Sequence, residues 1–135
     1  MQELIVEANY ESLHKVINFV DEELVRSRCT PQLQGNIHLA VEEIFTNIAK
    51  YAYHPASGRV SVSIAVADEV LIRFEDTGKP YNPMEHPEPD LDKPLMEREI
   101  GGLGVFLVKK MMDKIDYIRL DNKNVLTMAK KVNSS

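Results

Sequence analysis

Hydrophobic positions in the first half of the chain predict one short strand followed by two long helices. An apolar run is typical of a strand over residues 2–8. Apolar residues then recur every three or four positions over about 10–27, behind the capping residue Asn9. The same spacing over 31–53 predicts a second helix, which starts with a threonine cap and a proline and ends before His54-Pro55. The apolar positions are Leu4, Ile5 and Val6 in the strand, Leu13, Val16, Ile17, Val20 and Leu24 in the first helix, and Leu33, Ile37, Val41, Ile44 and Ile48 in the second.

The period of the apolar positions changes to two beyond residue 59, which predicts an antiparallel hairpin. Apolar residues alternate with small or polar ones over 60–66 and again over 70–75. Residues 67–69 between these strands are few enough to form a tight turn. The next stretch, 79–100, contains five prolines among acidic residues and fits no regular element. An ordered loop of this length is usually functional.

The last third of the chain predicts one more helix and one more hairpin. Apolar residues at helical spacing extend over about 103–114, and two short strands over 117–120 and 125–132 flank a turn at 121–124. Strands and helices are therefore grouped and do not alternate strictly. This order predicts a single domain over residues 1–135 with an α/β two-layer sandwich fold, in which helices cover one face of a mostly antiparallel mixed sheet.

Composition excludes several classes of function. The chain has 135 residues, 44% hydrophobic and 27% charged, with a net charge of −5 and no basic run, so no direct contact with nucleic acid is expected. A single cysteine, Cys29, excludes an internal disulfide and fits a reducing compartment. No signal peptide and no apolar run long enough to span a bilayer is present, so we expect a cytoplasmic protein without a membrane segment.

The first group of candidate functional residues lies in the second predicted helix. Glu43 and Asn47 are four positions apart, so one helical face presents both side chains. A carboxylate there can act as a general base, and an amide oxygen suits Mg²⁺, which prefers hard oxygen ligands. The rival carboxylate, Glu42, points about a third of a turn away. The alternative is that these are polar residues on a solvated helix face.

The second group follows the hairpin. Asp76 comes at the end of the strand over 70–75, and Gly78 follows at turn spacing. An aspartate at this point can accept a hydrogen bond from an exocyclic amine, and a glycine lets a planar ring approach the backbone closely. An ordinary Asp-x-Gly turn would produce the same pattern.

The third group precedes the last helix. Gly101, Gly102 and Gly104 surround Leu103, and so many glycines imply unusual backbone angles or close approach. The helix that follows offers free amide groups to a phosphate. Arg98 could supply a bidentate cation to the same group. The alternatives are a flexible joint and a surface arginine. No Gly-x-x-x-x-Gly-Lys-Ser/Thr motif occurs, so any phosphate site is not a Walker loop.

Together the three groups resemble the ATP-binding boxes of the GHKL (histidine-kinase-like ATPase) superfamily, and within it those of the bacterial anti-sigma factor serine/threonine kinases. The first box is similar to residues 40–53, AVEEIFTNIAKYAY, and the second to 76–83, DTGKPYNP. The third is similar to 97–108, which contains Glu-Arg and then Gly-Gly-Leu-Gly, and the closing segment to 126–131, LTMAKK. The resemblance covers about residues 5–132.

The resemblance implies a Bergerat-type ATP-binding fold and a role for each motif residue. It implies Glu43 as the catalytic base, Asn47 as the magnesium ligand, Asp76 and Gly78 as adenine contacts, and Thr127 as support of the adenine pocket. For the phosphates it implies contact with Arg98, a hinge at Gly101, Gly102 and Gly104, and further nucleotide contacts from Lys50 and Leu103. The proline-rich stretch 79–100 would be the ATP lid.

The function implied is that of an ATP- and Mg²⁺-dependent serine/threonine protein kinase. It would phosphorylate an antagonist protein of the STAS type, sequester a sigma factor and form a homodimer. The alternatives are a nucleotide-dependent binding module without phosphotransfer and a switch kinase that does not bind sigma. Two departures from the family pattern are Tyr51, where these kinases often carry histidine, and Lys79-Pro80, which replaces the second glycine of the wider superfamily's Asp-x-Gly-x-Gly.

Overall fold

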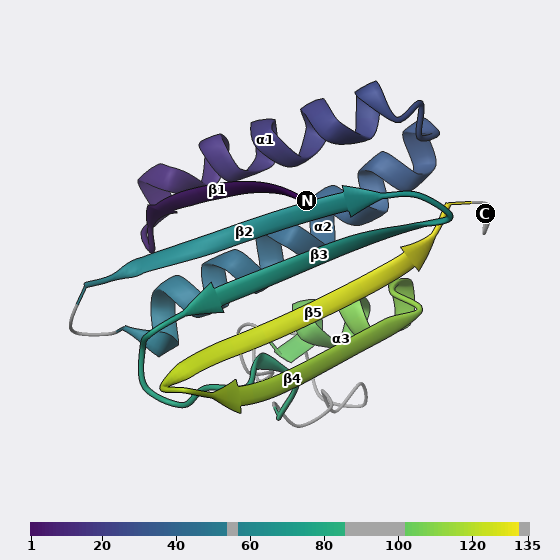
Figure 1. The fold of residues 1–135 in the computed structure, drawn as a ribbon. Helices are drawn as coiled ribbons and strands as arrows, with labels where there is room; N and C mark the ends of the chain where they lie inside the picture. Colours follow the sequence, from purple (N-terminus) through teal and green to yellow (C-terminus); the bar gives the residue numbers. More distant parts are fainter. Residues whose placement is uncertain (54–56, 86–101, 133–135) are drawn as a thin grey trace.

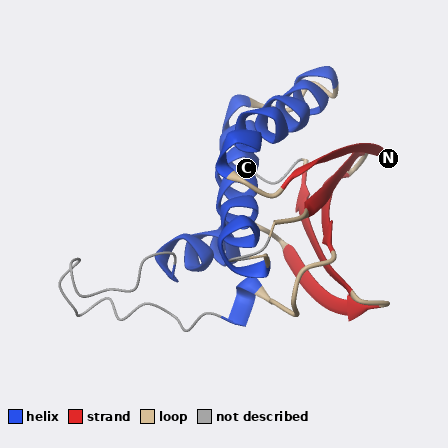
Figure 2. Ribbon diagram, turned by 90° about the vertical axis from the view of Figure 1, so that its left-hand side faces the viewer, coloured by secondary structure: helices blue, strands red, loops and turns tan. Residues whose placement is uncertain are grey.

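The computed structural model describes residues 1–53, 57–85 and 102–132, which form one five-stranded sheet with helices on one face (Figures 1 and 2). The sheet order is β1-β2-β3-β5-β4. Every strand pair in the described residues is antiparallel, where the sequence predicted a mostly antiparallel mixed sheet. The elements are β1 (Gln2–Glu7), η1 (Tyr10–Ser12), α1 (Leu13–Arg26), α2 (Pro31–Asn47), η2 (Ile48–Ala52), β2 (Arg59–Val66), β3 (Glu69–Asp76), η3 (Pro83–Glu85), α3 (Gly102–Met111), β4 (Lys114–Leu120) and β5 (Lys123–Lys131). The two-layer α/β fold is confirmed.

Both N-terminal helices begin at the predicted caps. Asn9 Oδ1 accepts a hydrogen bond from Ser12 N at 2.9 Å, although the first turn, η1, is a 3₁₀ turn that leads into α1. Thr30 Oγ1 accepts one from Leu33 N at 3.2 Å, with Pro31 at the first position of α2. After Asn47 the chain winds into the π-helical turn η2, where the sequence predicted a continuous helix to residue 53. The expected stop at His54-Pro55 lies outside the described residues.

The hydrophobic core lies between the helices and the inner face of the sheet. Strand residues alternate, so one apolar set per strand packs beneath the helices, and in Figure 2 no described helix covers the opposite face. The largest fully buried side chains include Phe45 of α2 and Phe74 of β3. Around them lie Val16, Val20 and Leu24 of α1, Ile37, Val41 and Ile44 of α2, Val60, Val62 and Ile64 of β2, Val70 and Ile72 of β3, and Leu126 and Met128 of β5.

The C-terminal part differs from the prediction at the end of the helix and at the start of both strands, since β5 already begins at Lys123, where the sequence predicted a turn over 121–124. The sequence predicted a helix to about residue 114, but α3 ends at Met111 and Lys114 already begins β4. Asp113 explains the difference, because its N–H donates to Ala129 O at 2.9 Å and its carboxylate accepts from Lys131 N at 2.6 Å, so it is already tied to β5. None of the helices in the described part of the chain is long and apolar enough to span a membrane.

Candidate nucleotide-binding site

The C-terminal half of α2 brings Glu43 and Asn47 together. Asn47 Nδ2 donates a hydrogen bond to Glu43 Oε1 at 3.0 Å, as residues four apart on a helix can. Asn47 is only 2% exposed, whereas Glu43 is partly exposed. Burial of the amide argues against a solvated helix face for Asn47. Among the described residues the amide oxygen of Asn47 accepts no hydrogen bond, so it remains available to a ligand.

Helix α3 meets α2 at the Glu43 carboxylate. A Cβ atom built on Gly104 would lie 2.2–2.4 Å from the Cδ, Oε1 and Oε2 atoms of Glu43, so only a glycine leaves the carboxylate where it is. Gly102 is the first residue of α3, and Leu103 lies in its first turn. Gly101, Arg98 and most of the predicted lid, residues 86–100, lie outside the described residues.

Asp76 ends β3 and is buried, with 4% of the residue exposed. Its Oδ1 accepts hydrogen bonds from Gly78 N at 3.0 Å and from Asn124 Nδ2 at 2.9 Å. Burial raises the pKa of the Asp76 carboxyl, while these two hydrogen bonds and the positive charge of Arg119 act in the opposite direction. Gly78 packs on the end of η2, where an added Cβ would lie 2.5 Å from Ala52 O.

The strand register places Thr127, the predicted support of the adenine pocket, away from Asp76. Thr127 pairs with Arg73, three residues away from the Asp76–Asn124 pair of β3 and β5. Its neighbours Leu126 and Met128 are buried beneath the helices, so Thr127 points to the opposite face of the sheet. Asn124 is the β5 residue that pairs with Asp76, and sequence analysis did not select it because only the strand register brings it there.

Two tyrosines form a ring pair near Glu43. The Tyr51 and Tyr81 rings have centroids 5.4 Å apart at an angle of 40°, and Lys50 Nζ lies 5.6 Å from the Tyr51 ring centroid. Burial raises the pKa of Tyr81, and the neighbouring Tyr51 and the negative charge of Glu43 raise it further. The sequence singled out Tyr51 only as a departure and gave Tyr81 no role, although both lie within the motifs.

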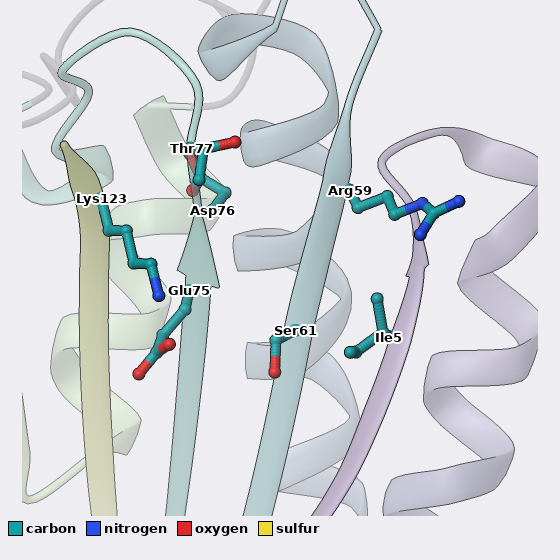
Figure 3. A pocket seen from close by; sticks show the side chains of 7 residues that line it. All are labelled: Ile5, Arg59, Ser61, Glu75, Asp76, Thr77 and Lys123. Atoms are coloured by element: carbon teal, nitrogen blue, oxygen red, sulfur yellow. The ribbon is translucent and has the colours of Figure 1, made fainter.

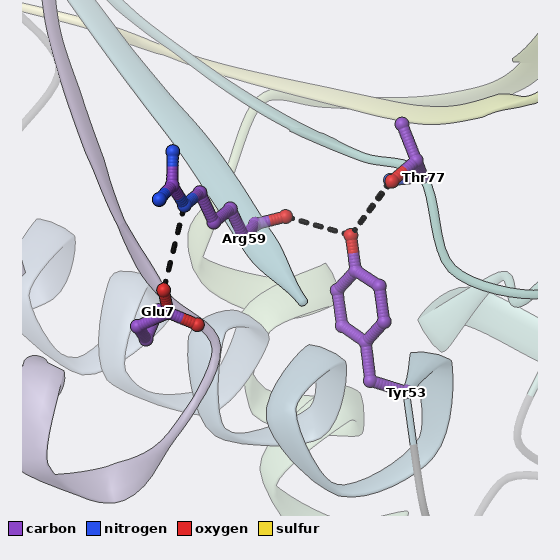
Figure 4. Close-up of polar contacts among 4 residues, drawn as sticks. All are labelled: Glu7, Tyr53, Arg59 and Thr77. Atoms are coloured by element: carbon purple, nitrogen blue, oxygen red, sulfur yellow. Dashed lines mark hydrogen bonds and ion pairs between the residues drawn. The ribbon is translucent and has the colours of Figure 1, made fainter. Parts of the chain in front are cut away.

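Tyr53 fixes the chain directly after Asp76 (Figure 4). Its hydroxyl donates to Arg59 O at 2.7 Å and accepts from Thr77 N at 2.8 Å, so it joins the end of η2 to β2 and to the loop that follows β3. Arg59 Nε also forms an ion pair with Glu7 at 3.4 Å. These contacts place Thr77, and therefore Gly78, against the helical layer.

A hollow on the open side of the sheet also touches Asp76 (Figure 3). Its volume is about 170 Å³, and the residues that line it are Ile5, Arg59, Ser61, Glu75, Asp76, Thr77 and Lys123. Ligand pockets usually measure roughly 300–1,000 Å³, so this hollow is small for a nucleotide. Glu43, Asn47 and the packing of Gly78 on Ala52 lie instead on the helical side of the sheet.

Comparison with known proteins gives the family. The sequence pattern of the histidine kinase-like ATPase domain matches residues 6–130, nearly the whole chain. The chain belongs to this family. A histidine kinase-like ATPase domain implies the use of ATP, and the predicted GHKL resemblance is thereby confirmed.

Similar proteins include two kinases. The chain is 29% identical to serine/threonine-protein kinase BtrW of Bordetella bronchiseptica, over 77% of this chain and 75% of that protein. It is 32% identical to serine-protein kinase RsbW of Halalkalibacterium halodurans, over 70% of this chain and 60% of that protein.

Solved structures show the same fold. One holds the RsbU and RsbW domains of a Mycobacterium tuberculosis protein, with a TM-score of 0.64 at 12% identity over 98% of this chain and 33% of that one. Another is the Acinetobacter baumannii histidine kinase AdeS, with a TM-score of 0.54 at 16% identity over 99% of this chain and 70% of that one.

Proposed function

We propose that this histidine kinase-like ATPase domain is an ATP- and Mg²⁺-dependent protein kinase that phosphorylates a serine or threonine of a STAS-type antagonist protein and also sequesters a sigma factor. The observation that supports a kinase most directly is the Glu43 carboxylate, which lies between Asn47 and the first turn of α3 at Gly104. The similarity to BtrW and RsbW supports the choice of a protein as the recipient.

The residues present fit the expected magnesium ion. Asn47 has its amide nitrogen committed to Glu43 and its oxygen uncommitted among the described residues, and amide and carboxylate oxygens are the hard ligands that Mg²⁺ prefers. When bound, Mg²⁺ neutralises charge on the phosphates. Asn47 would hold the ion, and the amide groups in the first turn of α3 would face the phosphates.

Glu43 would take the proton of the attacking hydroxyl. In this step the serine or threonine oxygen bonds to the γ-phosphorus, the bond from that phosphorus to the β–γ bridging oxygen breaks, and ADP leaves with the bonding electrons. The hydroxyl proton passes to the Glu43 carboxylate. Asp76 and Gly78 would hold the adenine, which positions the γ-phosphate for the attack.

The proposal is tested by incubating the chain with ATP labelled at the γ-phosphate, Mg²⁺ and a STAS-domain protein encoded beside it. Labelled phosphoserine or phosphothreonine on that protein is expected, together with retention of a neighbouring sigma factor on the immobilised chain. Tight ATP binding without transfer would instead identify a binding module. Transfer without sigma retention would identify a switch kinase.

Gly104→Ala is expected to lower phosphotransfer by about tenfold or more with little change in stability. The added Cβ would meet the far end of the Glu43 side chain, which can rotate away at small cost, but the carboxylate would then leave its position. Phosphotransfer rates and thermal unfolding of both proteins measure the two effects. Wild-type transfer by the variant would contradict the placement of the base beside α3.

A further inference from the structure

Asn124, at the start of β5, is buried to 3% exposure, and its side chain is hydrogen-bonded on both sides. Its Nδ2 donates to Asp76 Oδ1 at 2.9 Å and to Lys79 O at 2.8 Å, which uses both amide protons. Its Oδ1 accepts from Tyr81 N and from Arg119 Nη1, each at 3.2 Å, and from the Tyr117 hydroxyl.

The partners of Asn124 belong to two groups that are distant in sequence. One group is the segment of residues 76–81, which begins at the last residue of β3 and carries the proposed adenine contacts. The other is the inner face of β4, from which Arg119 Nη1 also donates to Gly78 O at 2.8 Å. A residue that served only the β4–β5 turn would have no need of the first group. Asn124 therefore connects the hairpin to the segment that would hold the base.

We propose that Asn124 is a positioning residue for recognition of the nucleotide base: its amide fixes the Asp76 carboxylate and holds residues 78–81 in place beside it. This inference rests on the proposed function, because it names the residue that gives the ATP site its preference for adenine.

The hydrogen bond from Asn124 determines which oxygen of Asp76 is available to a ligand. Both hydrogen bonds that Asp76 accepts in the described part of the chain go to Oδ1, so Oδ2 is the oxygen left to accept from the exocyclic amine of adenine. The donated hydrogen bond of Asn124 also favours the ionised carboxylate, against the effect of burial. Without the amide, the carboxylate can turn and its buried charge loses a donor.

Asn124→Asp tests the proposal with an isosteric change. One carboxylate oxygen can still accept from Tyr81, Arg119 and Tyr117, but the other would face Asp76 Oδ1 and Lys79 O, which are both acceptors. Two carboxylates this close share a proton, so the variant would regain a donor only in acid. The control is Asn122→Asp, the same change on an exposed turn residue whose φ of 64° aspartate tolerates.

The measurement is the dissociation constant of ATP and of inosine triphosphate, which carries an oxo group in place of the amine, at pH 8 and pH 5.5. The wild type and Asn122→Asp are expected to prefer ATP by about tenfold or more. In Asn124→Asp this ratio should fall close to one at pH 8 and recover in part at pH 5.5. In Asn124→Ala the ratio should be close to one at both pH values. This variant tests the positioning role if Asn124→Asp does not fold.

Two results would overturn the positioning role of Asn124 and leave the ATP site in place. One is a wild-type ratio of ATP to inosine triphosphate affinity in both Asn124 variants. The other is an equal loss of affinity for both nucleotides that accompanies a lower unfolding temperature. A wild-type chain that binds neither nucleotide would overturn the proposed function, and the inference with it.

Discussion

Replacing Glu43 with glutamine is expected to lower phosphotransfer about 10²–10⁴-fold while ATP affinity stays within a few-fold, because a general base contributes about that factor and a neutral amide cannot take the proton. Glutamine keeps the shape of the side chain and an oxygen that can accept the hydrogen bond from Asn47 Nδ2. The fold should therefore be preserved. Single-turnover transfer to the partner protein measures the chemical step, and a separate titration measures ATP binding.

Glu42→Gln is the matched control for this experiment. Glu42 is the adjacent carboxylate on α2, but its side chain is exposed and lies 3.9 Å from His38 Nε2, not beside Asn47. This variant should transfer phosphate at the wild-type rate. A large loss in Glu42→Gln with normal transfer in Glu43→Gln would show that Glu42, and not Glu43, is the base. Equal transfer rates in the wild type and both variants would show that neither carboxylate acts as a base.

The fold follows from the sequence where a local rule decides it. The caps at Asn9 and Thr30 and the change of apolar period from helical to alternating predicted the elements and the single covered face. The predicted end of α3 was wrong because Asp113 forms hydrogen bonds with β5 residues that are sixteen and eighteen positions away in the sequence. The π turn after Asn47 also escaped prediction, since the apolar stripe continues through it.

The candidate site was predictable where its members are close in sequence. Glu43 with Asn47, and Asp76 with Gly78, are pairs whose contacts follow from helix and turn spacing. Asn124 joins Asp76 only through the β3–β5 register, which no local pattern contains. Thr127 is three positions from Asn124 on β5, so the two side chains face opposite sides of the sheet, which the sequence alone did not reveal.

Gly78→Ala is expected to weaken ATP binding about tenfold or more and to lower the free energy of unfolding by about 1–3 kcal/mol. The added Cβ would lie 2.5 Å from Ala52 O and 2.9 Å from Ala52 C, which are backbone atoms that cannot rotate away. The loop would have to move off η2. That movement would break the hydrogen bonds of Gly78 N to Asp76 Oδ1 and of Arg119 Nη1 to Gly78 O.

Gly35→Ala provides the matched control for the glycine change. Gly35 lies within α2, is exposed, and has nothing within 4 Å of an added Cβ, so this variant should gain roughly 0.5–1 kcal/mol of stability and bind ATP normally. Chemical unfolding of both variants gives the free energy of unfolding, and titration with ATP gives the affinity. If Gly78→Ala bound ATP as tightly as Gly35→Ala, the close packing of the loop on η2 would have no part in holding the nucleotide. If both quantities fell only in Gly78→Ala, this packing would be what keeps Asp76 and the base site in place.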